Sequence, residues 1–177
     1  MTKTFSNKDF NSSDGMLTSV WGPSMWHTLH TISFNYPVNP SNDEKKKYFI
    51  FFNSLGNILP CRYCRENLKN NLKCNPLSMK TMKDRKSLSL WLYKLHETVN
   101  KMLGKKSGLS YNDVRERYEN FRSRCLSNKK PLKKTKKERG CTKPLYGNKS
   151  KCVINIVPKN KKCKTFKIDK SCIIKRK

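Results

Sequence analysis

The stretch Leu59-Pro60-Cys61-Arg62-Tyr63-Cys64-Arg65 carries the C-x-x-C motif of this 177-residue chain, where one apolar helix is expected to end and another to begin. Pro60 suits a first helical position, which would place both cysteines in the opening turn of the second helix. Unpaired backbone N–H groups there, together with Arg62 and Arg65, favour thiolate over thiol. The stretch therefore predicts a reactive dithiol and leaves open whether it serves redox chemistry or a metal.

Two common uses of a C-x-x-C find little support in the rest of the chain. A structural zinc site needs two more ligands, and the chain has no second C-x-x-C and only three histidines, so no metal ligand set is assigned. A thioredoxin-type motif requires alternating strands and helices, which the periodicity does not give. A dithiol turns over only if something accepts its electrons, so a cofactor is expected. A basic, cysteine-rich protein with structural zinc and a nucleic-acid-binding tail remains the rival interpretation.

Amphipathic helices are predicted on both sides of the motif. Apolar residues recur at helical spacing, and Ser41 with Glu44 forms a capping box at one helix start. Gly104 lies where the fourth helix should terminate, and Met79 to Lys86 is predicted to be a polar link. With short connections, the pattern predicts an all-α fold, a four-helix bundle plus a short fifth helix. The expected helices cover about 21–36, 42–59, 61–75 and 87–103, then 110–125 with Ser110 as the N-cap and Asp113 three residues on.

The composition divides the chain into three parts. Residues 1–19 are polar and aperiodic, which predicts a flexible N-terminal arm, and residues 20–126 form the helical domain. Residues 127–177 form a basic, largely disordered tail rich in Lys and Cys, because 129–177 holds 19 Lys and Arg against 2 Asp and Glu. Only short β-prone pieces interrupt it, such as Val153-Ile154-Asn155-Ile156-Val157. Such charge attracts nucleic acid or an acidic partner without selecting one, or serves solvation alone.

Hydropathy and the N-terminal sequence bear on where the protein acts. No apolar run approaches the roughly 18 residues that would span a bilayer, so no membrane span is expected. The polar residues 1–19 have no apolar core of a secretory signal, so the protein is not expected to be secreted. Eight cysteines in a cytosolic chain indicate metal or redox chemistry more than a structural disulfide framework.

Aromatic and histidine side chains accompany the dithiol on two separate helices. Each tryptophan or histidine alone is best explained as a core residue. Together their stacking faces and hydrogen-bonding edges suit a large planar cofactor held between helices. The residues are Trp21, Trp26, His30, Tyr36, Trp91, His96 and Asn100.

Four blocks carry a resemblance to a known family. They are Trp21-Gly22-Pro23-Ser24-Met25-Trp26-His27-Thr28-Leu29-His30, Tyr36-Pro37, Pro60-Cys61-Arg62-Tyr63-Cys64, and Trp91-Leu92-Tyr93-Lys94-Leu95-His96-Glu97-Thr98-Val99-Asn100-Lys101-Met102-Leu103-Gly104-Lys105. In order, spacing and identity they resemble the Erv/ALR family of FAD-linked sulfhydryl oxidases over about residues 20–120. The chain looks most like the members encoded by large nucleocytoplasmic DNA viruses.

The resemblance implies a fold, a cofactor and an activity. It implies a helical bundle that binds FAD, forms a homodimer, and makes disulfides in thiol-bearing substrate proteins, with oxygen as acceptor and hydrogen peroxide as product. Cys64 would be the flavin-proximal cysteine and Cys61 the exchange cysteine that meets substrate. Matching cofactor contacts are Trp26, His30 and Tyr36 around the flavin, His96, Asn100, Leu103 and Lys105 at the adenine, ribose and diphosphate, Gly22 and Ser24 in a loop near the cofactor, and Tyr118 as a later aromatic contact.

Three positions depart from the family pattern. Glu97 follows His96 where the family commonly has Asn, which affects one polar contact. Pro23 replaces a frequent Arg, so another basic residue would have to supply that diphosphate contact. Cys74 lies near a family disulfide position, but the stretch from Leu103 to Ser110 offers it no partner. Cys74 and Cys125 are therefore expected to be buried or free thiols.

The tail cysteines and the cellular location complete the predictions. Family members often carry a second cysteine pair on a flexible arm that passes electrons to the C-x-x-C. The tail cysteines Cys141, Cys152, Cys163 and Cys172 are spaced too widely for the usual pair, so they are predicted to be substrate-like or incidental thiols, with a Cys163–Cys172 shuttle as the alternative. The resemblance also implies action in the host cytoplasm at the site of viral assembly, and leaves packaging into the virion open.

Overall fold

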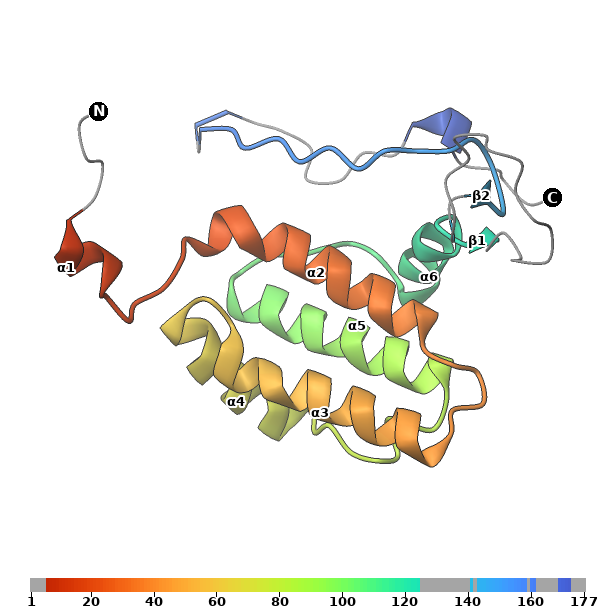
Figure 1. The fold of residues 1–177 in the computed structure, drawn as a ribbon, viewed down its shortest axis with the longest axis horizontal. Coiled ribbons are helices and arrows are strands. Elements are labelled where there is room, and N and C mark those ends of the chain that lie inside the picture. The colour runs from red at the N-terminus through yellow and green to blue at the C-terminus, as the bar shows by residue number, and fades with distance from the viewer. Residues whose placement is uncertain (1–5, 125–140, 142, 159, 162–168, 173–177) are drawn as a thin grey trace, which may run out of the picture. The chain divides into compact units, whose positions relative to one another are not determined.

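A computed structural model describes residues 6–124, 141, 143–158, 160–161 and 169–172 (Figure 1). This part of the chain is mostly helical, as the sequence predicts. The chain divides into two compact units, Met1–Gly108 and Leu109–Lys177. The domain boundaries predicted at residues 19/20 and 126/127 stay predictions. The elements are α1 (Asn7–Phe10), α2 (Thr18–Asn35), α3 (Asn42–Ile58), α4 (Arg62–Cys74), α5 (Arg85–Met102), α6 (Tyr111–Glu119), β1 (Ser123–Arg124), β2 (Lys143–Pro144) and the 3-10 turn η1 (Lys170–Cys172).

Helices α2 to α5 form the predicted four-helix bundle in the first unit. Helix α5 packs against α2 and α4, and α4 packs against α3, an arrangement visible in Figure 1. Burying the apolar stripes of these helices against one another removes them from water, which is the main stabilising term of such a bundle. The buried core consists of Leu29, Tyr36, Phe52, Leu55, Leu68, Met82, Leu88, Trp91, Leu92 and Leu95.

Local capping residues set the helix limits. Ser41 and Glu44 form the predicted capping box at the start of α3. Helix α5 begins at Arg85, two residues before the expected Ser87, because Asp84 serves as its N-cap. Gly104 follows the C-cap of α5 with φ +66°, the left-handed conformation in which glycine commonly ends a helix.

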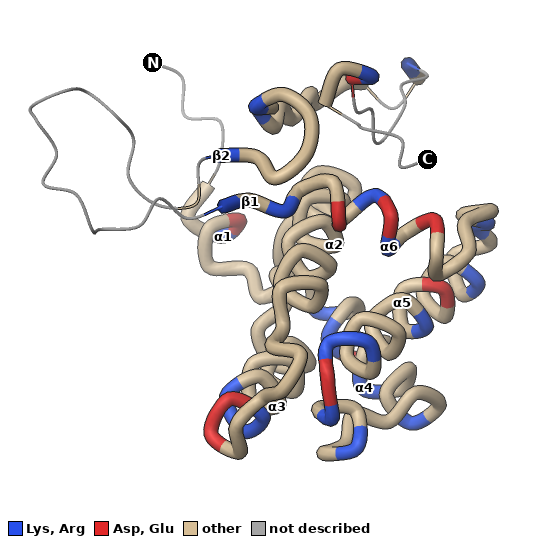
Figure 2. Tube along the Cα trace, turned by 90° about the vertical axis from the view of Figure 1, so that its right-hand side faces the viewer, with Lys and Arg blue, Asp and Glu red and all other residues tan. Residues whose placement is uncertain are grey.

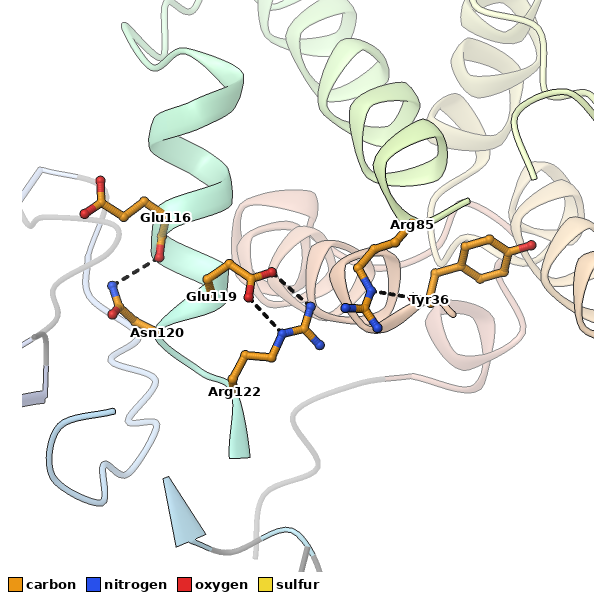
Figure 3. A network of polar contacts seen from close by, with 6 residues as sticks. All are labelled: Tyr36, Arg85, Glu116, Glu119, Asn120 and Arg122. Carbon is orange, nitrogen blue, oxygen red and sulfur yellow. Dashed lines mark hydrogen bonds and ion pairs between the residues drawn. The ribbon is translucent and has the colours of Figure 1, made fainter. Parts of the chain in front are cut away.

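The connection between α4 and α5 differs from the prediction. The segment Met79 to Lys86 was expected to be a polar link, but Met82 is fully buried in the core. Its carbonyl accepts a hydrogen bond of 2.8 Å from the Tyr36 hydroxyl. Arg85 Nε donates to the Tyr36 carbonyl at 2.6 Å (Figure 3). These contacts tie the link to the end of α2 and turn Met82 inward.

The second unit contains the short fifth helix and a small sheet. Ser110 and Asp113 form a capping box at the start of α6, as predicted. The helix ends at Glu119 rather than continuing to the expected end at Cys125, which itself lies outside the described residues. An ion pair between Glu119 and Arg122, 2.9 Å long, closes this end (Figure 3). Strands β1 and β2 pair antiparallel, whereas the β-prone residues 153–157 form no strand and are largely exposed.

Basic side chains are spread over the bundle surface. Figure 2 shows Lys and Arg along α3, α4 and α5. The acidic residues of α3, Asp43 and Glu44, lie in its first turn, where they face the positive end of the helix dipole. In the part of the chain that the structure describes, no helix combines the length and apolar character needed to cross a membrane.

Candidate functional site

The dithiol lies at the N-terminus of α4, with its two cysteines in different positions. Cys61 is the N-cap residue in an extended conformation, and its Sγ accepts a hydrogen bond of 3.3 Å from the Cys64 amide. The expectation that Pro60 occupies the first helical position is therefore wrong, since Pro60 lies one residue before the N-cap. The difference arises because the Cys61 sulfur itself caps the helix. Cys64 follows within the first turn of α4.

The two thiols have opposite pKa shifts. Partial burial acts to raise the pKa of Cys61, but hydrogen bonds from the Cys64 side chain, the Thr18 hydroxyl and backbone amides outweigh burial and lower it. Burial raises the pKa of Cys64, and its hydrogen bond to Cys61 and the Cys61 charge raise it further. The predicted thiolate is therefore favoured at Cys61.

The arginines of the motif act differently from the prediction. Arg65 donates a hydrogen bond of 2.6 Å to the Leu59 carbonyl. Arg62 lies over the Tyr63 ring and 3.9 Å from the Asp14 carboxylate. Both guanidinium groups have other partners, and hydrogen-bond donors around Cys61 account for its lowered pKa.

Residues 14–18, here called the strap, lie against the dithiol. Gly15 forms an antiparallel bridge with Cys61, the Met16 amide donates to the Pro60 carbonyl, and the Arg62 amide donates to the Asp14 carbonyl at 3.2 Å. The last contact satisfies one of the open amides at the start of α4. Thr18 then places its Oγ1 3.4 Å from Cys64 Sγ. These residues were predicted to belong to the flexible arm, although the Asp14-Gly15 dipeptide is a turn signal.

Trp26, His30 and His96 form a ring cluster between α2 and α5. The Trp26 and His96 rings stack with centroids 3.9 Å apart and planes at 4°. His30 Nε2 and His96 Nδ1 are 3.0 Å apart, within hydrogen-bond distance. Burial lowers the pKa of His30 to about 3, helped by the neighbouring His96 and His27 charges. Burial likewise lowers the pKa of His96 to about 4. The nearby Lys105 charge lowers this pKa further, whereas the Glu97 charge acts to raise it. Both imidazoles are therefore neutral at physiological pH.

The other predicted cofactor residues near α2 have structural contacts of their own. Gly22 and Ser24 were predicted to lie in a loop, but both lie within helix α2. Gly22 is buried there, and a Cβ at this position would lie 3.4 Å from the Thr18 methyl. The Ser24 hydroxyl donates to the Trp21 carbonyl at 2.8 Å. Tyr36 is fully buried and hydrogen-bonds to Met82, so its ring belongs to the core.

The predicted residues near the end of α5 are more exposed. Asn100 Nδ2 donates to Glu97 Oε1 at 3.0 Å, which gives the unusual Glu97 a defined partner. The Lys105 amide donates to the Asn100 carbonyl at 2.8 Å, and Leu103 is 54% exposed at the C-cap. Tyr118 lies on α6 in the second unit, edge-on to Phe121 with ring centroids 5.7 Å apart.

The residues of the first unit fit a planar cofactor with a diphosphate. The ring cluster offers stacking faces and neutral nitrogens, and Lys105 supplies positive charge that acts on His96. Asn71 Nδ2 is buried and has no hydrogen-bond partner among the described residues. It lies seven residues after Cys64, on the same face of α4, so a ligand acceptor there would satisfy it. Within the described residues, no three His, Cys, Asp or Glu side chains gather to hold a metal.

The remaining cysteines differ in state. Cys74 and Cys152 are exposed free thiols, and Cys172 is a half-buried free thiol. Cys141 is disulfide-bonded, which differs from the prediction of a thiol at this position. Cys125 and Cys163 lie outside the described residues. Because Cys172 is a free thiol, the structure does not contain the Cys163–Cys172 disulfide, and a shuttle role for this pair stays a prediction.

Comparisons with known proteins agree with this geometry. The model of the Erv1 / Alr family matches residues 23–119. The chain is 36% identical over 104 residues to a probable FAD-linked sulfhydryl oxidase of Acanthamoeba polyphaga mimivirus, covering 59% of this chain and 72% of that one. It is 31% identical over 99 residues to the FAD-linked sulfhydryl oxidase of African swine fever virus, isolate Tick/Malawi/Lil 20-1/1983, covering 56% and 80%.

Solved structures show the same fold. The structure is similar to the yeast Erv1 core with a TM-score of 0.53 and 25% identity, covering 66% of this chain and 92% of that chain. It is similar to the FAD binding domain of Erv1 from Saccharomyces cerevisiae with a TM-score of 0.53 and 27% identity, covering 58% and 94%. With the family match across the dithiol and both helices of the ring cluster, the chain belongs to the Erv1/Alr family.

Proposed function

We propose that this protein is an FAD-linked sulfhydryl oxidase that forms disulfide bonds in substrate proteins. The observation that carries the proposal is a reactive dithiol at the start of α4 in the same bundle as the Trp26–His30–His96 cluster. Relatives named FAD-linked sulfhydryl oxidases support it. FAD, when bound, accepts the electron pair of the dithiol and reduces oxygen to hydrogen peroxide.

Cys61 is proposed as the exchange cysteine and Cys64 as the cysteine nearer the flavin. A substrate thiolate attacks Cys61 Sγ of the oxidised pair, and Cys64 leaves as the thiolate. The second substrate thiolate then attacks the substrate sulfur of the mixed disulfide, and Cys61 leaves. A lower pKa makes a better leaving group, so the lowered pKa of Cys61 favours this release.

The ring cluster and the end of α5 are proposed to hold the cofactor. Trp26 offers a stacking face, and His30 and His96 stay neutral and can exchange hydrogen bonds with ring nitrogens and oxygens. Lys105 and Asn100 at the end of α5 would bind the diphosphate and ribose. The buried Asn71 amide would donate to a cofactor oxygen. These residues orient the group and exclude water from it.

Purification of the full chain tests the function. A yellow protein with flavin absorbance that consumes oxygen and releases peroxide when given a reduced protein dithiol is the expected result. A colourless protein that contains zinc would favour the rival, a basic zinc protein that binds nucleic acid. A protein that contains flavin but leaves dithiols unoxidised would refute the oxidase activity and support only the binding of FAD.

A homodimer is proposed as the working state. A shallow open cavity of about 200 Å³ lies on the α2–α3 face, lined by Ile32, Lys47, Tyr48 and Phe51. Three of its four lining residues, Ile32, Tyr48 and Phe51, present apolar surface that a second copy would remove from water. A second copy of the chain is the proposed occupant, because the family resemblance implies a dimer.

Two proposals concern the surroundings of the enzyme. The basic residues of 129–177 are proposed to contact nucleic acid or another polyanion, on the basis of their net charge alone. The host cytoplasm is proposed as the site of action, supported by the viral relatives. Microscopy of the tagged protein in infected cells tests the location, and signal confined to the secretory pathway would contradict it.

A further inference from the structure

The Thr18 hydroxyl lies beside the Cys64 sulfur of the dithiol. Its Oγ1 is 3.4 Å from Cys64 Sγ, and the hydroxyl also acts to lower the pKa of Cys61. Thr18 is the first residue of α2 and comes 46 positions before Cys64, so this contact belongs to the tertiary structure. A hydroxyl has one rotatable hydrogen and can donate it to either sulfur.

Backbone contacts of the strap hold Thr18, its last residue, beside the dithiol. Gly15 pairs with Cys61, and Met16 donates its amide to Pro60. On the other side, Trp21 Nε1 of α2 donates to the Met16 carbonyl at 3.0 Å. Backbone contacts therefore fix the chain just before Thr18 to the dithiol and to α2. Two elements therefore hold the backbone that carries the hydroxyl.

We propose that Thr18 is a positioning residue for the dithiol, whose hydroxyl donates a hydrogen bond to whichever sulfur carries negative charge. When a substrate thiolate attacks Cys61 Sγ, one S–S bond forms, the Cys61–Cys64 bond breaks, and the electron pair moves to Cys64 Sγ. Thr18 then donates to Cys64. When the mixed disulfide is resolved, the pair moves to Cys61 Sγ, and Thr18 donates there. Hydrogen bonds to charged groups are about twice as strong as neutral ones.

The neighbouring charged and titratable groups do not supply this stabilisation. Arg62 lies between Asp14 and Tyr63, and Arg65 donates to the Leu59 carbonyl. The Thr18 hydrogen bond acts to lower the pKa of both thiols. Removing the hydroxyl should therefore raise the pH at which each thiolate forms.

Three variants of the full chain test the proposal. Thr18→Val removes the hydroxyl with little change in shape, and Thr18→Ser restores it. Thr31→Val is the matched control, because Thr31 also lies on α2 but donates to the His27 carbonyl. Thr18 is exposed, so the Val variant should fold, which circular dichroism checks. The readout is the pH dependence of iodoacetamide alkylation of Cys61 and Cys64 in the reduced protein, followed peptide by peptide by mass spectrometry.

The pH midpoint of Cys61 alkylation should rise by about one unit in Thr18→Val. Alkylation of Cys61 below the midpoint should then be about tenfold slower than in the wild-type protein. Thr18→Ser should return it to the wild-type value, and Thr31→Val should leave it unchanged. An unchanged midpoint in Thr18→Val, or a Ser variant that matches the Val variant, would overturn the proposal. The role of Thr18 in catalysis rests on the proposed oxidase function. The alkylation of Cys61 and Cys64, in contrast, can be measured whether or not flavin is bound. A colourless protein would thus overturn the oxidase and leave this measurement valid.

Discussion

At the scale of single residues, the two cysteines of the motif are chemically unequal. Cys61 caps α4 and receives several hydrogen bonds, whereas Cys64 is more affected by burial and by the Cys61 charge. A thiol with a lowered pKa is a good leaving group in exchange with substrate. The inequality supports separate jobs for the two sulfurs.

Replacing Cys64 should separate cofactor binding from turnover. Cys64→Ser is expected to retain flavin absorbance and to lose oxidase turnover by more than about a hundredfold, because no dithiol remains to be oxidised. Oxygen consumption with a reduced protein substrate measures it. Cys74→Ser is the control and should keep full turnover, since Cys74 is an exposed free thiol outside the motif. Retained activity in Cys64→Ser would refute the assigned role.

The buried histidines should make stability depend on pH. His30 and His96 have folded pKa values of about 3 and about 4, against 6.5 when solvated. The unfolded chain therefore binds protons first as pH falls, so stability is complete above 6.5 and declines until pH reaches the folded values. By about pH 5 the loss is about 2 kcal/mol for each histidine.

Urea unfolding at neutral pH and near pH 5 measures this decline. His30→Gln should flatten it, because one of the two titrating groups is removed. His27→Gln is the comparison, since His27 is less buried and its pKa is lowered less. Equal declines in the wild-type protein and in His30→Gln would contradict the prediction.

At the scale of elements, the strap and the start of α4 form one structure. Asp14 satisfies an open amide of α4, and Gly15 approaches Cys61 with φ +99°. A Cβ at Gly15 would lie 2.9 Å from Cys61 Cα and collide with the Pro60 carbonyl. Glycine is required here both for its conformation and for its lack of a side chain.

Gly15→Ala should detach the strap from the dithiol. The expected cost is about 1–3 kcal/mol in the free energy of unfolding, from backbone strain and lost pairing. The alkylation midpoint of Cys61 should rise as in Thr18→Val, because the hydroxyl is no longer held in place. Gly108→Ala is the matched control, since Gly108 also has positive φ but has open space around its Cβ position. A destabilised Gly15→Ala with an unshifted midpoint would show that the strap does not place the hydroxyl.

At the scale of the whole molecule, the apolar α2–α3 face predicts self-association. Phe51 is 37% exposed and lines the cavity with Tyr48 and Ile32. Phe51→Glu should convert a dimer to a monomer, because a carboxylate would be buried without a partner. Light scattering on the eluted protein measures the mass. Asn53→Glu adds the same charge at another exposed position of α3 and should leave the dimer intact.

The basic tail predicts salt-dependent binding to polyanions. Residues 129–177 carry a net charge of +17, so the full chain should bind duplex DNA at low salt and lose affinity steeply as salt rises. A chain ending at Asn128 should bind far more weakly, while its alkylation profile stays unchanged. Fluorescence anisotropy of labelled DNA measures the affinity of each chain, and mass spectrometry measures the alkylation profile. Binding that survives the truncation would assign the contact to the bundle.

The sequence by itself determined the helices and the family. Ser41 with Glu44, Ser110 with Asp113, and Gly104 act within one helical turn, so their effects can be predicted from neighbours in the chain. The apolar periodicity predicted which faces would be buried. It also predicted an all-α bundle, which the structure and the Erv1 neighbours confirm.

Only the tertiary structure decided how the dithiol is surrounded. The contact from Thr18 to Cys64 spans 46 positions, and that from His30 to His96 spans 66. Met82, in a segment of polar appearance, is buried, and its carbonyl accepts a hydrogen bond from Tyr36, 46 positions earlier. Capping is a local interaction, because its partners lie only a few positions apart in the sequence. Contacts across such separations depend on how all the helices pack together, which no local pattern records.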